Sequence, residues 1–476
     1  MRRKTKIIAT LGPACASQDA ISRMVGAGMD VARLNFSHGT YDSHRQFIEW
    51  VRAAAEEHGR AIAVLQDIQG PRIRVGSFPG GSVTLESGSQ VRLVDGNDEG
   101  TDEQIFVQHL AAASLAPGDR VLLSDGLITL RVAELNGEVV VAEVVEGGEL
   151  RNNKGAAFPG ATLSLPAITP KDIEDLEFGK EAGVDLVAAS FVTGAADIRQ
   201  VKEIVDDVPV IAKIERVSAY ANLDEIVSVA DGAMVARGDL GVELGFEPLP
   251  RAQKEIVART NGSGGISITA TEMLESMTSS PRPSRAEVTD VANAVLDGSD
   301  AVMLSAETAA GQYPVRSIEV MAAICVEAES SPGYPSGTHV EFVDVEANFA
   351  SAIAQATADV ANSLALSTVV AFTESGRTAQ LVAKYRPDSE IVAFTPKAAT
   401  YNQMAIVWGV TPLMFPRLDS TDEMITKAEE ALQEHGIVEV GEWVAMAAGI
   451  PPNQEASTNL LKLHVVGSGS DGVPTA

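Results

Sequence analysis

Short apolar runs alternate with amphipathic segments along most of the chain. The segments 41–59, 195–207 and 284–298 have apolar residues at the three-to-four-residue spacing of a helix. Ser284 and Glu287 form the pattern of a capping box at the start of the last one. This alternation predicts a (β/α)8 barrel. Its eight expected strands are residues 6–12, 30–36, 61–67, 185–191, 209–215, 232–239, 265–271 and 300–307.

The pattern changes between about residues 70 and 168, where Gly-rich turns separate short strands of alternating polarity. This predicts an all-β module inserted after the third barrel strand. After about residue 331 a stretch rich in Pro, Gly and Ser is typical of a linker. A smaller alternating α/β unit follows and begins with a helix expected over 346–366. The domains expected are a catalytic barrel (1–69 and 167–335), an inserted β-barrel lid (70–166), and a C-terminal α/β regulatory domain with a mostly parallel sheet (336–476).

Composition narrows the class of protein. The 476 residues suffice for two or three domains, and the formal net charge of −29 argues against nucleic acid or an anionic membrane as the main partner. Cys15 and Cys325, the two cysteines, form neither a disulfide framework nor a metal cluster. No stretch is apolar enough to span a membrane, and the basic N-terminus lacks the apolar core of a signal peptide. A cytoplasmic protein is expected.

The stretch "VPVIAKIE" (208–215) is an apolar strand that ends in Lys213 and Glu215. Residues two apart on a strand share a face, so the ammonium and the carboxylate project together. In a (β/α)8 barrel the active site lies at the carboxyl ends of the strands, so other polar strand endings are expected to meet there. These are Arg33, Asn35 and Ser37; Asp67; Arg237 and Asp239; Thr269 and Thr271; and Ser305 and Glu307.

The chemistry of this rim favours phosphoryl transfer. Glu215 and Asp239 are ligands suited to a hard divalent cation such as Mg²⁺. Arg33 and Lys213 suit phosphate and enolate oxygens, and Arg74 lies at the mouth of the inserted module. Carboxylates, a divalent cation and cationic clamps are the components of phosphoryl-transfer sites. Any one of these charged residues alone would be interpreted as a side chain exposed to water where its strand leaves the core.

The sequence resembles the pyruvate kinases. The similarity spans essentially the whole chain in the order of the family, with the inserted module in its place. The matching stretches are "VARLNFSHG" (31–39), "GPRIRVG" (70–76), "AKIE" (212–215), "MVARGDLGVE" (234–243), "ATEMLESM" (270–277), "PRPSRAEVTDVANAVLDGSDAVMLSAETAAGQYP" (281–314) and "FTESGRTAQLVAKYRPDSEIVAFTP" (372–396).

The resemblance implies transfer of the phosphoryl group of phosphoenolpyruvate to ADP, which gives pyruvate and ATP, with Mg²⁺ or Mn²⁺ as cofactor. It implies catalytic roles for Lys213, Arg33, Arg74 and Thr271. It implies binding of the substrate by Arg33, Lys213, Gly238, Asp239 and Thr271, and of the divalent metal by Glu215 and Asp239. It implies that the nucleotide is bound by Asn35, Phe36, Ser37, His38, Arg74 and Lys154. It implies that a monovalent cation is bound by Asn35, Ser37, Asp67 and the main chain of Ile68.

The resemblance also implies a homotetramer, a lid that closes over the site, and allosteric regulation through the C-terminal domain. There, Ser375, Gly376, Arg377 and Thr378 lie between a strand and a helix, in the arrangement of a phosphate cradle. Arg72 departs from the family, because potassium-dependent members have Glu at this position. We expect its guanidinium to replace the monovalent cation, so that K⁺ is not required. Glu272 stands where Gln is usual and adds negative charge close to Thr271.

Two other functions remain open from the sequence. A Mg²⁺-dependent barrel lyase acting on an oxo-acid enolate would use Lys213, Glu215 and Asp239, but it would not need Arg74 and Lys154. A weakly active or non-catalytic paralogue that senses metabolites would not need the intact rim. Pyruvate formation from phosphoenolpyruvate, with and without ADP, distinguishes the three.

Overall fold

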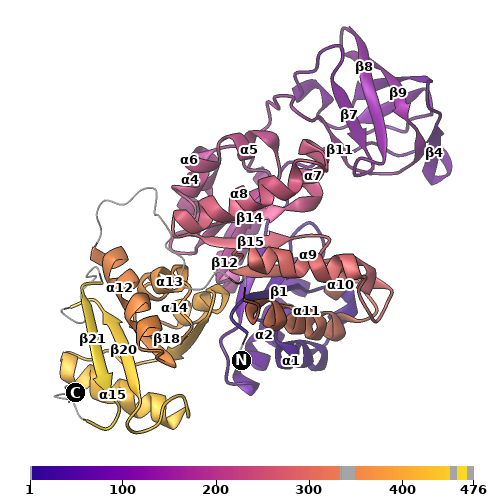
Figure 1. The fold of residues 1–476 in the computed structure, drawn as a ribbon. Helices are drawn as coiled ribbons and strands as arrows, with labels where there is room; N and C mark the ends of the chain where they lie inside the picture. The colour runs from indigo at the N-terminus through magenta and orange to yellow at the C-terminus, as the bar shows by residue number, and fades with distance from the viewer. Residues whose placement is uncertain (1–2, 333, 335–348, 451–457, 469–476) are drawn as a thin grey trace.

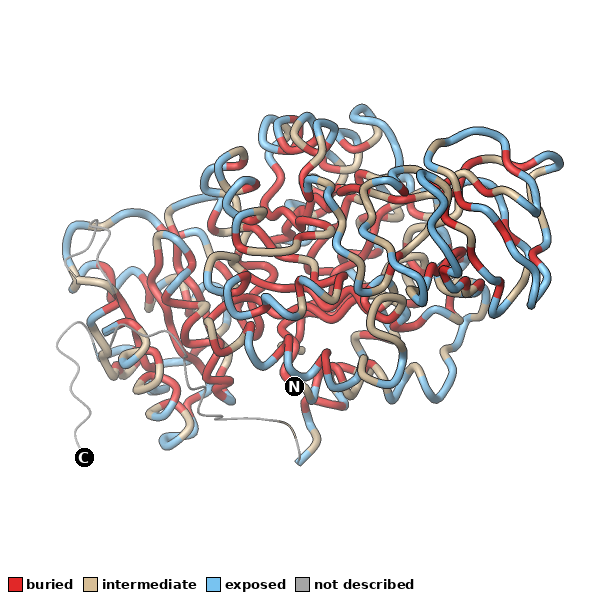
Figure 2. The backbone as a smooth tube through the Cα atoms, turned by 90° about the horizontal axis from the view of Figure 1, so that it is seen from above, coloured by how far each residue is buried: buried red, intermediate tan, exposed pale blue. Residues whose placement is uncertain are grey.

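The computed structural model describes the chain apart from residues 1–2, 333, 335–348, 451–457 and 469–476. Its sheets form a closed barrel, an all-β part and a C-terminal α/β part (Figure 1). The all-β part extends from the barrel on the side away from the C-terminal part. Buried residues concentrate in the barrel strands and in the C-terminal sheet (Figure 2).

The expected (β/α)8 barrel is confirmed, with all neighbouring strands parallel and in the order β1-β16-β15-β14-β13-β12-β3-β2. Alternate residues of a strand face opposite sides. Ile211 packs with Leu65 and Ile268, whereas Ala212 packs in the cluster that includes the surrounding helices. The strands are β1 (Lys6–Thr10), β2 (Val31–Asn35), β3 (Ala63–Asp67), β12 (Leu186–Ala189), β13 (Val210–Ile214), β14 (Gly232–Ala236), β15 (Ile266–Ala270) and β16 (Ala301–Leu304).

Helices cover the outside of the barrel. The capping box expected at Ser284 is present, because Ser284 Oγ accepts from Glu287 N while Glu287 Oε2 accepts from Ser284 N at 2.6 Å. The α-helices are α1 (Gln18–Ala27), α2 (Tyr41–Glu57), α3 (Pro170–Ala182), α4 (Ala195–Val205), α5 (Val217–Ala221), α6 (Leu223–Val227), α7 (Arg237–Leu244), α8 (Leu249–Gly262), α9 (Arg285–Leu296), α10 (Ala306–Ala309) and α11 (Pro314–Glu329). Single 3₁₀ turns lie at Pro13–Cys15 and Glu275–Thr278.

Strands β14 and β16 each end three residues earlier than expected, which corrects the rim. Strand β14 stops at Ala236, so Arg237 and Asp239 lie in the first turn of α7, where the helix dipole favours a carboxylate. Strand β16 stops at Leu304, and Glu307 is fully buried in α10 with its carboxylate accepting from Leu274 N and Ser305 N.

Thr269 also lies off the rim, because its hydroxyl bonds to Ser299 at 2.8 Å. Ser305 directly follows β16, and its buried hydroxyl has no hydrogen-bond partner among the described residues.

The inserted part is all-β, as expected, and packs around its own apolar core. Its connections to the barrel pair with each other, because Arg74 bridges Gly155 and Val75 N donates to Lys154 O at 2.9 Å. It contains a sheet of order β11-β7-β8-β9-β5-β6 and a β10-β4 pair. The strands are β4 (Ser82–Leu85), β5 (Gln90–Asp95), β6 (Gln104–Val107), β7 (Arg120–Leu123), β8 (Ile128–Asn136), β9 (Val139–Glu146), β10 (Gly148–Arg151) and β11 (Ala156–Ala157), with 3₁₀ turns at Pro79–Gly81 and Leu110–Ala112.

The C-terminal sheet has the order β19-β18-β17-β20-β21, parallel except for β21, which confirms a mostly parallel sheet. Most of the expected linker and the expected start of its first helix lie outside the described residues. The elements are α12 (Phe349–Ser363), β17 (Thr368–Phe372), α13 (Arg377–Lys384), β18 (Glu390–Thr395), α14 (Ala398–Gln403), a 3₁₀ turn at Met404–Ile406, β19 (Val410–Met414), α15 (Thr421–Glu434), β20 (Trp443–Ala448) and β21 (Leu460–Val465).

A buried ionic cluster joins the C-terminal part to the base of the barrel. Asp300, just before β16, pairs with Lys384 at the end of α13 and with Arg386 at 2.8 Å. The three side chains are at most 5% exposed. Arg386 also donates to Gly298 O and lies over the Trp408 ring. Buried charges of this kind need their partners, so the cluster fixes how the two parts pack.

In the part of the chain that the structure describes, no helix is long and apolar enough to cross a membrane. The exact domain boundaries expected from the sequence remain a proposal.

Candidate active site at the carboxyl end of the barrel

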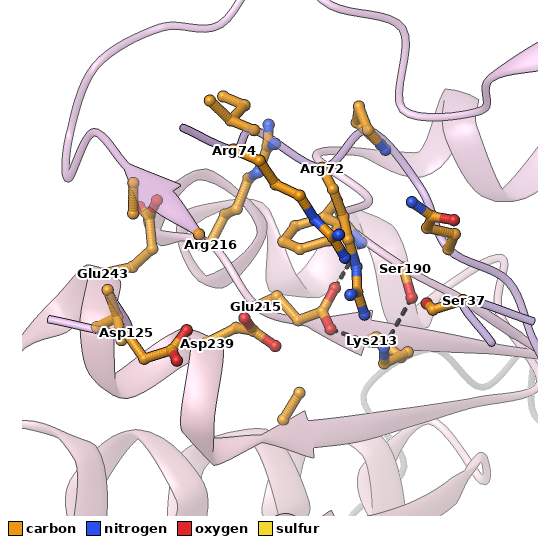
Figure 3. Close-up of a pocket in the computed structure, with 18 of the residues that line it drawn as sticks. Ser37, Arg72, Arg74, Asp125, Ser190, Lys213, Glu215, Arg216, Asp239 and Glu243 are labelled. Carbon is orange, nitrogen blue, oxygen red and sulfur yellow. Dashed lines mark hydrogen bonds and ion pairs between the residues drawn. The ribbon is translucent and has the colours of Figure 1, made fainter. Parts of the chain in front are cut away.

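A cavity of about 400 Å³ lies where the carboxyl ends of the barrel strands meet the inserted part (Figure 3). Its walls come from the barrel and from inserted residues such as Asp125, Asn153 and Lys154. Most of the rim residues expected from the sequence meet here. Those that line the cavity are Arg33, Asn35, Ser37, Asp67, Ile68, Arg72, Arg74, Lys154, Lys213, Glu215, Asp239 and Thr271.

The Lys213 ammonium has an acceptor for each of its three N–H groups. Its Nζ lies 2.7 Å from Ser190 Oγ, 2.7 Å from Glu215 Oε1 and 3.2 Å from Asp67 Oδ1. Burial alone would lower the pKa of Lys213, but Asp67 and Glu215 more than offset it and hold the pKa above its ordinary value. The site therefore keeps a charged ammonium at the rim.

Arg33 and Asp67 form the second ion pair of the rim. Arg33 Nε lies 2.7 Å from Asp67 Oδ2, and its Nη1 donates to Thr10 Oγ1 at 2.9 Å. Burial would raise the pKa of Asp67, but Lys213 and Arg33 more than offset it and lower the pKa. Asp67 is therefore an anion that orients both cations.

Glu215 and Asp239 supply hard oxygen donors to the cavity. Glu215 is 1% exposed, and its Oε2 accepts from Phe191 N at 2.6 Å. Burial raises the pKa of Glu215 to about 7; Lys213 opposes the rise and Asp239 adds to it. Because the Asp239 carboxylate disfavours the charged form of Glu215, a cation bound between the two groups would be stabilised by both.

Within the described ranges no group of three or more His, Cys, Asp or Glu side chains could hold a metal. Mg²⁺ is commonly bound by one or two carboxylates together with substrate oxygens and water, so this pair fits it.

Arginines from the hinge of the inserted part face these acids. Arg72 and Arg74 line the cavity and are half-buried. Burial and then Arg74 lower the pKa of Arg72, while Asp239, Glu215 and Asp67 act in the opposite direction. Figure 3 shows Arg72 directed into the cavity rather than into solvent.

Three residues for which the resemblance implies a binding role do not line the cavity. Phe36 is buried and stacks on His44 with ring centroids 4.2 Å apart. His38 is exposed at the edge of the site. Its pKa is lowered from the ordinary value, first by the partial loss of water around the ring and then by the positive charges of Arg72, Arg74 and Arg33. Gly238 contributes through its N–H, which donates to Thr271 Oγ1 at 2.8 Å.

Several lining residues were not among those expected from the sequence. Ser190 follows β12 directly, so the rule used for the other strands could have identified it. Its hydroxyl accepts from Lys213 and donates to Ile68 O at 2.7 Å. Arg216, Glu243 and Asp125 carry no comparable pattern.

The expected phosphate cradle lies apart from this cavity, at the start of α13. Gly376 has the left-handed conformation (φ 84°) that glycine adopts without strain, and the Thr378 hydroxyl bonds to that of Thr458. Glu374 pairs with Arg417 at 2.8 Å and lies 3.7 Å from Lys397.

Comparison with known proteins gives matches over nearly the whole chain. The family model described as "Pyruvate kinase, barrel domain" matches residues 2–318, and that described as "Pyruvate kinase, alpha/beta domain" matches residues 351–464.

Individual proteins match over a similar range. A pyruvate kinase of Corynebacterium glutamicum is 43% identical, covering 98% of this chain and 98% of its own length. One from Geobacillus stearothermophilus is 42% identical, covering 98% of this chain and 81% of its own. A crystal structure of a pyruvate kinase from Cryptosporidium parvum is 34% identical with a TM-score of 0.92, covering 98% of this chain and 96% of the other.

Proposed function

The chain belongs to the pyruvate kinase family, and we propose that the cavity between barrel and lid is where it transfers a phosphoryl group from phosphoenolpyruvate to ADP. The observation that carries this placement is the Lys213 ammonium, held between Asp67 and Glu215 at the rim and faced by Arg33 and the hinge arginines. The first test is pyruvate formation from phosphoenolpyruvate, which should require both ADP and a divalent cation. Pyruvate formation without ADP would indicate a lyase. No pyruvate formation under any condition would indicate a non-catalytic sensor.

Within this proposal Arg33 binds the substrate phosphate, and Lys213 stabilises the negative charge of the transferring group and of the enolate. Thr271 contacts the substrate and assists protonation of the enolate. Asn35, Phe36, Ser37, His38, Arg74 and Lys154 form the nucleotide side. Phe36 acts there indirectly, by holding the turn that carries Ser37 and His38.

Glu215 and Asp239 would hold Mg²⁺ or Mn²⁺, which when bound supplies positive charge to phosphoryl and enolate oxygens. The lid would close over the reactants and exclude water, which otherwise competes with ADP for the phosphoryl group.

Asp239→Ala should weaken the dependence on Mg²⁺ and lower turnover together, because the metal has few protein ligands here. We expect half-saturation by Mg²⁺ to rise about 10–100-fold, the scale on which lost metal-site interactions act. A magnesium titration of the initial rate measures this. Asp224→Ala, at an exposed ion pair on the outside of the barrel, is the control. An unchanged titration would refute the metal assignment.

Activity should not require K⁺. The position of Arg72 in the cavity wall supports this, because a guanidinium there supplies fixed positive charge beside Asp67 and Glu215. The measurement is the initial rate without Na⁺ or K⁺ against added KCl, with ionic strength held by a tetraalkylammonium salt. A rise of about a hundredfold with K⁺, equal to about 2.7 kcal/mol, would contradict the proposal. Arg72→Glu should create a K⁺ requirement through Asn35, Ser37, Asp67 and Ile68 O.

The cradle Ser375–Thr378 is proposed to bind a monophosphorylated effector in preference to fructose 1,6-bisphosphate. Glu374 repels a second phosphate and occupies the nearby Arg417 and Lys397. Calorimetry with a sugar monophosphate, a nucleoside monophosphate and the bisphosphate tests this preference. Tight binding of the bisphosphate alone would contradict it.

The homotetramer implied by the family resemblance and the cytoplasmic location expected from the sequence composition are also proposed. Light scattering of the purified protein and fractionation of cells test them.

A further inference from the structure

The loop after β15, which carries Thr271, has an unfavourable backbone conformation. Thr271 and Glu272 both have positive φ, 68° and 54°. Residues with a Cβ, and β-branched ones above all, rarely adopt this region, and two in succession require support from their surroundings. Thr271 itself is part of the cavity wall.

Arg237 supplies that support from the first turn of α7. Its Nη2 donates to Thr271 O at 2.6 Å and to Glu272 O at 3.1 Å. Its Nε donates to Thr271 O at 3.1 Å and lies 3.3 Å from Ala270 O. Arg237 is 8% exposed. One rigid guanidinium thus binds consecutive carbonyl groups of the loop.

The far side of the guanidinium is anchored to two helices. Its Nη1 pairs with Asp290 of α9 at 2.7 Å and lies 3.4 Å from Gln253 Oε1 of α8. The next residue along the chain, Gly238, donates its N–H to Thr271 Oγ1, and that hydroxyl donates to Ala270 O at 2.6 Å. The start of α7 therefore fixes both the backbone and the hydroxyl of Thr271.

An alternative is that Arg237 serves only to neutralise Asp290. The contacts argue against it. Asp290 is 34% exposed and has access to water, and pairing with it uses Nη1 alone. The other two nitrogens point to the loop carbonyl groups.

We propose that Arg237 is a positioning residue that holds Thr271 in place for protonation of the enolate. The inference rests on the proposed function and deepens it. In that step one proton adds to C3 of the enolate, the C–O⁻ group becomes the carbonyl of pyruvate, and water replaces the proton given up by the donor. Phosphoryl transfer, which depends on Lys213 and Arg33, does not need the Thr271 hydroxyl. Loss of Arg237 should therefore separate the two steps.

The test compares two readouts in Arg237→Gln. One is exchange of the C3 hydrogens of pyruvate with deuterium oxide, followed by NMR with MgCl₂ and ATP present, which is protonation in reverse. The other is ATP formed from phosphoenolpyruvate and ADP in a single turnover. We expect exchange to fall about 10–100-fold, the scale on which lost orientation acts, while single-turnover ATP formation at saturating phosphoenolpyruvate changes less than about threefold.

Matched variants make the result decisive. Asp290→Asn keeps the bonds from Arg237 to the loop and should leave exchange within about threefold of the unmodified enzyme. Arg237→Lys keeps the charge and part of the bonding, so it should restore part of the exchange, and it replaces Arg237→Gln if that variant does not fold. Thr271→Val sets the lower limit of exchange.

An equal fall in both readouts, unchanged exchange in the Arg237 variants, or normal exchange in Thr271→Val would each overturn the proposal. The unmodified enzyme separates this failure from that of the proposed function. If it forms no pyruvate from phosphoenolpyruvate and ADP, the function itself is wrong.

Discussion

Lys213→Met should lower the rate of phosphoryl transfer by about 10²–10³-fold or more, because a preorganised charge aimed at developing negative charge is worth several kcal/mol. The Lys213 side chain is 11% exposed, and its ammonium contacts Ser190, Glu215 and Asp67 together. Methionine has similar length but no charge, so the loss reports on the ammonium. The fold should persist, because Arg33 still pairs with Asp67.

The measurement is initial pyruvate formation at saturating Mg²⁺, with the circular dichroism spectrum as the check on folding. Lys180→Met removes an exposed ammonium that pairs with Asp206 on the barrel surface, so it should be nearly neutral. Turnover within a few fold of the unmodified enzyme in Lys213→Met would remove Lys213 from the mechanism.

Asp300→Asn should destabilise the protein by about 3–5 kcal/mol, because it leaves Lys384 and Arg386 buried without a counter-charge. Burial of Lys384, opposed by Asp300, lowers its pKa to about 8 even with its partner present. Burial would raise the pKa of Asp300, but Lys384 and then Arg386 more than offset it, so this pKa lies below its ordinary value.

The pKa of Asp300 fixes how the effect depends on pH. When folding lowers the pKa of a carboxyl, the carboxyl stabilises the folded protein at any pH above its pKa in the unfolded chain, which is about 3.9. The stabilisation is lost as the pH falls through the pKa of the folded state. The contribution of Asp300 itself to the difference between the two proteins should therefore be constant from pH 7 to pH 5 and shrink below about pH 4.

Urea unfolding followed by tryptophan fluorescence suits this test, since buried Trp408 lies under Arg386. Asp224→Asn, at an ion pair on the barrel surface, should change stability by less than about 1 kcal/mol. A loss in Asp300→Asn no larger than in this control would show that the cluster does not tie the two parts together.

The barrel was predictable because its signal is local and repeated. Each element can be identified from its own residues, without knowledge of what it packs against. The signals are apolar runs of strand length, helices with caps such as Ser284, and the change to alternating polarity near residue 70. The ends of strands were less certain. The run "GAMVARGD" is continuous in sequence, yet α7 begins at Arg237, whose side chain binds the Thr271 loop.

The rim was predictable for a similar reason. Lys213 and Asp67 lie at the carboxyl ends of their strands, on the face directed to the barrel interior. The barrel topology brings these strand ends together. The partners of these residues were not predictable. Arg237 with Asp290 and Phe36 with His44 meet through packing that no spacing in the sequence encodes.

The insertion of the lid between β3 and β12 also bears on how the chain folds. Asp67 and Ala188 are register partners on the adjacent strands β3 and β12, although the whole inserted part separates them along the chain. Closing the barrel first therefore means closing a very long loop. The entropy lost in closing a loop grows with its length, and such distant pairings form slowly. The paired connections at Arg74 and Gly155 shorten that loop once the lid has folded. The hinge that carries Arg74 would thus also join the two halves of the barrel during folding.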